Sequence, residues 1–270
     1  MADELDTGTA TAVVPAPPAP VRTDEVDGVL VVTIDRPEVR NAIDLATASA
    51  IADAMDRLDE DPSLVAGVVT GAGGTFCAGM DLRAFLAGER PSVPGRGFAG
   101  LVEAPPAKPL IAAVEGYAVA GGFEIVLACD LVTAAKGARF GLPEVKRGLL
   151  AGGGGLLRLP SRVPMSLAME WALTGDTFTA EVAHSFGLVN RLTPTGGALD
   201  AAVDLARTIA ANGPLAVRAT KRIITESRDW PGDEAFTRQN EIYEPVRSSD
   251  DAREGARAFR EKRAPNWMGR

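Results

Sequence analysis

Apolar residues along the first 160 positions occur in short runs separated by segments with helical spacing. The runs are typical of buried strands, which we expect over 29–34, 65–70, 110–114 and 131–135. Helical spacing predicts a helix over 44–58 with Asp44 as its N-terminal cap, and a second helix from Gly121 to Cys129. The residues over 88–100 include prolines and several glycines, and we expect a mobile loop there.

The pattern after about residue 162 is mostly helical. We expect helices over 166–173, 180–184, 198–211, 215–227, 232–246 and 250–260. Strand–helix alternation followed by a run of helices predicts an α/β core with a helical C-terminal module. Residues 1–20 are rich in Ala, Pro and Thr, which predicts a disordered tail. The expected division is therefore a tail over 1–20, a core over 21–200 and a helical module over 201–270.

Composition and charge narrow the classes of function. The 270 residues are 46% apolar and 24% charged, which suits a globular chain with a sizeable core. A net charge of −8 argues against nucleic acid as a partner, because phosphate binding needs clustered Lys and Arg. Two separated cysteines and one histidine predict neither a metal site nor a His-based triad. Without an N-terminal signal pattern or an apolar run near ~20 residues, we expect a cytoplasmic protein that does not enter the membrane.

Glycine-rich segments suggest a close approach of backbone to a ligand. The stretches 71–75 and 152–155 match neither a P-loop nor a dinucleotide fingerprint, because the required later residues are absent. Glycine also lets bare N–H groups face a ligand, and this is the interpretation that we develop.

Five segments together resemble the crotonase (enoyl-CoA hydratase/isomerase) superfamily. They are Arg-Asn-Ala at 40–42, Phe-Cys-Ala-Gly-Met-Asp-Leu at 76–82, the Gly-Tyr to Phe-Glu stretch at 116–124, Asp130, and Phe-Gly-Leu-Pro-Glu at 140–144. They follow the order and spacing of the family over about residues 29–158. The resemblance implies an α/β fold, with a crotonase-like ββα spiral core and a helical C-terminal trimerisation module. It also implies a homotrimer or a dimer of trimers.

The resemblance also implies the site. The family's oxyanion hole is formed by two backbone N–H groups, which by motif position are those of Ala78 and Gly121. Its two catalytic carboxylates correspond to Glu124 and Glu144, which are 20 residues apart. Further substrate-binding positions implied by the same motifs are Arg40, Ala42, Gly79, Met80, Asp81 and Leu82. The basic pairs 146–147 and 221–222 are candidates for the CoA phosphates, although a solvated surface is the more common place for such pairs.

The implied activity is that of an enoyl-CoA hydratase in fatty acid metabolism. Adding water to a 2,3-double bond conjugated to a thioester places negative charge on the thioester oxygen, which two N–H groups stabilise. Glu124 would handle the water and Glu144 the α-proton. CoA would be the carrier part of the substrate, without a further cofactor.

Three other functions stay open. These are an enoyl-CoA isomerase working with one carboxylate, a dehydratase of a polar acyl-CoA of the carnitinyl type, and an acyl-CoA-binding protein without turnover. Departures from the family pattern at Ala120, at Phe123 and at 150–152 leave the acyl group undefined.

Overall fold

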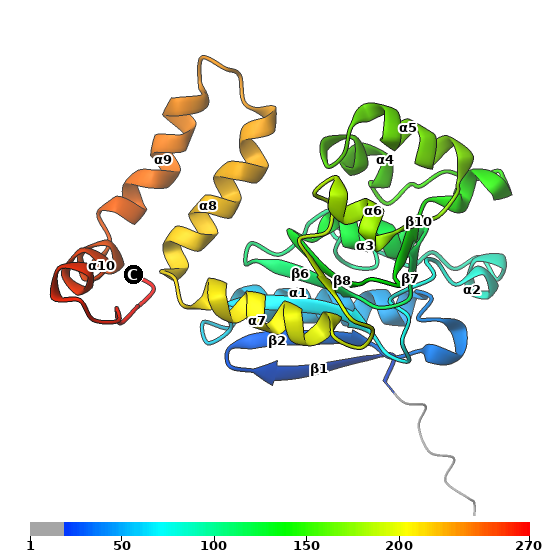
Figure 1. The fold of residues 1–270 in the computed structure, drawn as a ribbon, viewed down its shortest axis with the longest axis horizontal. Helices are drawn as coiled ribbons and strands as arrows, with labels where there is room; N and C mark the ends of the chain where they lie inside the picture. The colour runs from blue at the N-terminus through cyan, green and yellow to red at the C-terminus, as the bar shows by residue number, and fades with distance from the viewer. Residues whose placement is uncertain (1–18) are drawn as a thin grey trace, which may run out of the picture.

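A six-stranded sheet forms the centre of the computed structural model, which describes residues 19–270 (Figure 1). The expected tail over 1–20 lies almost wholly outside the described residues. The strand order is β1-β2-β3-β6-β8-β11. β1 and β2 form an antiparallel hairpin, and the other neighbours are parallel. The bounds are Val21–Val26 for β1, Val29–Ile34 for β2, Ala66–Gly71 for β3, Leu110–Val114 for β6, Leu131–Ala135 for β8 and Arg191–Thr193 for β11.

A three-stranded sheet of order β10-β9-β7 lies beside this centre. β7 is Tyr117–Val119, β9 is Arg139–Gly141 and β10 is Phe178–Thr179. β6 is joined to β7 by Glu115 and Gly116. Gly116 has a φ of 54°, which allows the chain to change direction sharply between the two strands. The next two strands, β8 and β9, repeat this step from the six-stranded sheet to the three-stranded sheet, which gives the chain a spiral path between the sheets.

Helices cover both faces of the six-stranded sheet, because alternate residues of its strands are apolar on each face. Leu30, Val32 and Ile34 pack with α1, Leu45–Glu60. Val29 and Val31 face the opposite side, with α7, Ala198–Ala210. α3, Gly121–Ala128, is buried along its whole length. The shorter helices are α2 at Leu82–Leu86, α4 at Gly155–Arg158, α5 at Met165–Thr174 and α6 at Ala180–Ser185.

The last three helices project away from the sheets (Figure 1). They are α8 at Pro214–Glu226, α9 at Ala235–Arg247 and α10 at Asp250–Glu261. Since α7 packs on the sheet, the projecting module starts at α8, and the expected boundary at residue 200 falls inside α7. Lys221 anchors α8, because its Nζ donates to Pro106 O at 2.8 Å, Lys108 O at 2.9 Å and Asp130 Oδ2 at 2.6 Å. Its ammonium group is thus used for hydrogen bonds that hold α8 against the rest of the fold.

Most of the expected elements are confirmed, several with the same bounds. The strands over 29–34, 110–114 and 131–135 agree with β2, β6 and β8, and Asp44 caps α1 by accepting from Thr47 N. Residues 88–100 instead hold a short hairpin of β4, Ser92–Val93, and β5, Gly97–Phe98. Within 19–270 no helix combines the length and the apolar character needed to cross a membrane.

Candidate active site

The turn from β7 into α3 leaves one backbone donor free. Ala120 has φ 52° and ψ −130°, and its N–H donates to Gly141 O at 2.9 Å. Gly121 follows as the first residue of α3, and its N–H has no acceptor among the described residues. A free N–H at this end of a helix also carries the positive end of the helix dipole. A side chain at Gly121 would overlap the ring of Phe98, which a Cβ would approach to 2.4 Å.

A second free donor lies in the segment 76–82, but it is not the one that the motif suggested. The N–H of Ala78 donates to Arg40 O at 3.1 Å, so it is not available to a ligand. Ile43 bonds the residues on both sides of Met80, through Gly79 O and Asp81 N, each at 2.8 Å. In such a parallel bridge the N–H of Met80 points away from Ile43. It has no acceptor among the described residues.

Gly79 brings the two free donors together. Its φ is 95°, a value suited to glycine, and it reverses the direction in which the next N–H points. A Cβ on Gly79 would lie 3.0 Å from Gly121 N. The backbone therefore passes directly beside the start of α3. The available pair of donors is Met80 and Gly121, in place of Ala78 and Gly121.

Glu124 lies one turn into α3 and is held by a glycine-rich turn. Its side chain is buried, and Gly155 N donates to Oε1 at 2.9 Å. A Cβ at Gly153 would be 2.7 Å from Oε2, so a side chain there would displace the carboxyl group. Burial raises the pKa of Glu124, while the N–H groups of Gly155 and Gly153 and the charge of Arg158 oppose that rise.

Glu144 lies in a short 3-10 helix, Pro143–Arg147, which follows β9. Its Oε2 is buried and has no hydrogen-bond partner among the described residues. Burial, with repulsion from Glu124 adding to it, raises the pKa of Glu144 to about 7. Glu144 can therefore both release and accept a proton near neutral pH. Gly155 lies against both Glu124 and Leu142, which is two residues before Glu144, so the segments that carry the two carboxyl groups meet there.

An aromatic cluster supports β9, the strand that leads to Glu144. Phe123 of α3 packs on Phe140 of β9, with 5.5 Å between ring centroids, and Trp171 of α5 stacks on Phe178 of β10 at 3.6 Å. Phe123 is fully buried in this cluster. Its ring therefore fills the core between α3, β9 and β10.

The remaining expected contact residues serve different purposes. The carboxylate of Asp81 caps α2, accepting from Arg83 N at 3.0 Å, and pairs with Arg36. Ala42 is buried, while Arg40 and Leu82 are exposed and stay candidates for substrate contact. Sequence motifs gave no sign of Phe98, which lies over Gly121 from a hairpin more than twenty residues away.

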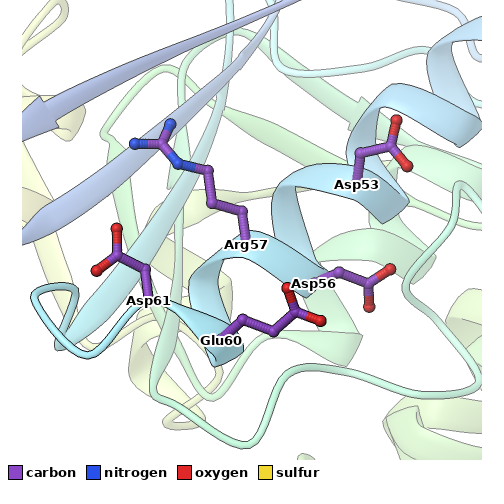
Figure 2. Close-up of a pocket in the computed structure, with 5 residues that line it drawn as sticks. All are labelled: Asp53, Asp56, Arg57, Glu60 and Asp61. Atoms are coloured by element: carbon purple, nitrogen blue, oxygen red, sulfur yellow. The ribbon is translucent and has the colours of Figure 1, made fainter.

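A surface hollow on α1 is unrelated to these residues. Figure 2 shows its five charged side chains: Asp53, Asp56, Arg57, Glu60 and Asp61. Arg57 pairs with Glu25, and Asp56 pairs with Arg96. Among residues 19–270, no three His, Cys, Asp or Glu side chains are grouped to hold a metal ion. The hollow is a solvated charged surface.

The spiral of two sheets thus carries, among the described residues, two free N–H groups at Met80 and Gly121 and two carboxyl groups with raised pKa at Glu124 and Glu144. Residues 24–270 match the family model described as enoyl-CoA hydratase/isomerase. The chain belongs to the enoyl-CoA hydratase/isomerase family.

Named relatives and solved structures agree with this assignment. Enoyl-CoA hydratase EchA19 of Mycobacterium tuberculosis is 44% identical over 89% of this chain and 93% of its own. A carnitinyl-CoA dehydratase of Salmonella arizonae is 44% identical over 89% of this chain and 95% of its own. A crystal structure of an enoyl-CoA hydratase from Mycobacterium marinum is 60% identical, with a TM-score of 0.92 over 93% of this chain and 100% of its own.

The left-handed conformation of Ala120 leads to a prediction about stability. A non-glycine residue in this region costs about 1–3 kcal/mol, whereas glycine adds about 0.5–1 kcal/mol of backbone entropy on folding. We expect Ala120→Gly to raise the free energy of unfolding by about 1 kcal/mol, as measured by urea denaturation. Ala118→Gly, in the ordinary strand conformation of β7, is the control and should lower stability. A loss of stability in Ala120→Gly would contradict the assigned strain.

Proposed function

We propose that the protein is a 2-enoyl-CoA hydratase, which adds water to a trans-2-enoyl-CoA in a syn manner or carries out the reverse dehydration. One observation carries the proposal. Two carboxyl groups with raised pKa, Glu124 and Glu144, lie on segments that meet at Gly155, and Glu124 follows the free N–H group of Gly121 by one turn of α3, beside the segment of Met80. Each chemical requirement of the reaction has a group of this chain to meet it.

The two N–H groups would bind the thioester oxygen. As water adds to the double bond, charge moves from C3 through C2 to this oxygen, and both donors become stronger partners. Removing one such donor costs about 10²–10³ in rate in other enzymes. The start of α3 adds its dipole at the Gly121 donor.

The two carboxyl groups would divide the proton transfers. Glu124, as the carboxylate, takes one proton from water while the hydroxide oxygen bonds to C3. Glu144, in its protonated form, gives its proton to C2 of the enolate. Its pKa of about 7 leaves a substantial protonated fraction at neutral pH. CoA is the carrier part of the substrate, and all steps are assigned to groups of the chain itself.

The alternatives differ in what they require. An isomerase can act with one carboxyl, whereas here Glu124 is also buried and held by Gly155 N. A binding protein without turnover would bear the cost of two buried carboxyls with no benefit. A dehydration of the carnitinyl type also needs a base and an acid, which Glu124 and Glu144 offer, and relatives named carnitinyl-CoA dehydratase are 42–44% identical. Turnover on a panel of apolar enoyl-CoAs and carnitinyl-CoA separates these two substrate classes.

Replacing Glu124 and Glu144 one at a time tests the roles proposed for the two carboxyl groups. Glu144→Gln should suppress hydration and also exchange of the α-proton of a saturated acyl-CoA in deuterated solvent. Glu124→Gln should suppress hydration by about 10²–10⁴ and retain part of the α-exchange, because that step uses only Glu144 and the two N–H groups. Hydration at the parent rate in Glu124→Gln would refute the two-carboxyl mechanism and favour an isomerase.

The raised pKa of Glu144 sets the expected pH dependence. Hydration needs the protonated acid, which is present below the pKa and lost as the pH rises through about 7. We therefore expect kcat/KM for hydration to fall on the alkaline side, while kcat/KM for dehydration, which needs the carboxylate, falls on the acid side of the same pKa. Rates measured in both directions from about pH 5 to about pH 9 check this. Hydration that increases through neutral pH would contradict the role given to Glu144.

We further infer a homotrimer or a dimer of trimers. α8 and α9 contain no buried residue, yet Ile224, Phe236 and Tyr243 are large apolar side chains that they leave exposed. Such surface is typical of an interface. Sedimentation should show the assembly at micromolar concentration, and Phe236→Glu should weaken it, whereas Arg222→Glu at an exposed polar position is the control. A stable monomer of the parent protein would exclude this inference.

A further inference from the structure

We propose that Arg36 is a positioning residue. It holds the N–H group of Met80 in the direction in which this group and the N–H group of Gly121 can bind the same oxygen atom. This inference rests on the proposed function, because it concerns the oxyanion hole of that reaction. Arg36 itself touches neither donor: it acts through the two chain segments that form the Met80 bridge.

The guanidinium group of Arg36 binds three oxygen atoms in a largely buried place. Its side chain is only 17% exposed. Nη2 lies 2.9 Å from Asp44 Oδ2 and 3.1 Å from Asp81 Oδ2. Nη1 donates to the carbonyl oxygen of Ala42. A planar fork with several donors suits this arrangement, and a lysine ammonium would not reproduce its geometry.

Each of these oxygens belongs to a residue that fixes the bridge. Ala42 directly precedes Ile43, whose N–H and C=O bond Gly79 O and Asp81 N. Asp81 directly follows Met80 and caps α2. Asp44 directly follows Ile43 and caps α1. Arg36 therefore joins the residues next to Ile43 to the residue next to Met80, and so holds both strands of the bridge in register.

Loss of the Arg36 cation would change the direction in which the N–H group of Met80 points. Without Arg36, the carboxylates of Asp44 and Asp81 would repel each other across the bridge. The flexible neighbour Gly79, with φ 95°, would offer little resistance to a shift of Met80. A misplacement of about 1 Å at a catalytic group can cost about 10²-fold in rate.

The experiment compares Arg36→Met with Arg207→Met. Arg207 is a matched control, because it also bridges two aspartates, Asp27 at 2.8 Å and Asp204 at 3.1 Å, on an exposed surface formed by α7 and the β1–β2 turn. The readouts are kcat and KM for hydration and the absorption of a bound cinnamoyl thioester of CoA. This chromophore absorbs at longer wavelength when its carbonyl oxygen accepts strong hydrogen bonds. Circular dichroism at the assay temperature reports the folded fraction, and the melting temperature reports the stability.

Arg36→Met should lower kcat by about 10–100-fold, change KM by less than about 3-fold and remove most of the red shift. Arg36→Lys, which keeps the charge and folds more readily, should lie between that variant and the parent. Arg207→Met should match the parent in all three readouts. The positioning role would be overturned if both Arg36 variants, per folded molecule, kept the red shift and the kcat of the parent protein. A parent enzyme with neither hydration nor red shift would instead refute the proposed function.

Discussion

Two backbone N–H groups, at Met80 and Gly121, have no acceptor among residues 19–270, and the rest of this structure is arranged around that constraint. An unpaired donor away from water costs about 1–3 kcal/mol, so a fold leaves one free only where the surroundings compel it. Here Ala120 and Gly79, at φ 52° and 95°, turn the chain on both sides of the pair. The parallel bridge to Ile43 and the buried helix α3 then hold these conformations.

Burial also changes the acidity of the two carboxyl groups. Burial raises the pKa of Glu144 to about 7 and that of Glu124 above its ordinary value. A low dielectric strengthens, in the same way, the attraction between N–H groups and a developing oxyanion. Glycine N–H groups support Glu124, whereas Glu144 Oε2 has no hydrogen-bond partner within the described part of the chain. This difference agrees with the proposed roles, in which Glu124 acts as the base and Glu144 carries a proton.

Elements with continuous apolar runs were predictable from the sequence, because both faces of strands such as β2 and β6 are buried. β1 was missed because four of its six residues are exposed, and β7 and β9 because three residues carry too little pattern. The motifs located the donor segment but placed the donor at Ala78. Which N–H is free depends on the reversal at Gly79 and on the bond from Ala78 to Arg40. Such details, and contacts distant in sequence like Phe98 on Gly121, require the three-dimensional structure.

The most direct test is a crystal structure of the protein with a saturated acyl-CoA such as butanoyl-CoA. The account predicts the thioester oxygen within about 2.7–3.2 Å of both Met80 N and Gly121 N. It also predicts C2 next to Glu144 and C3 next to Glu124. A thioester oxygen bound to Ala78 N, with the bond from Ala78 to Arg40 broken, or an acyl group bound away from both carboxyls, would contradict it.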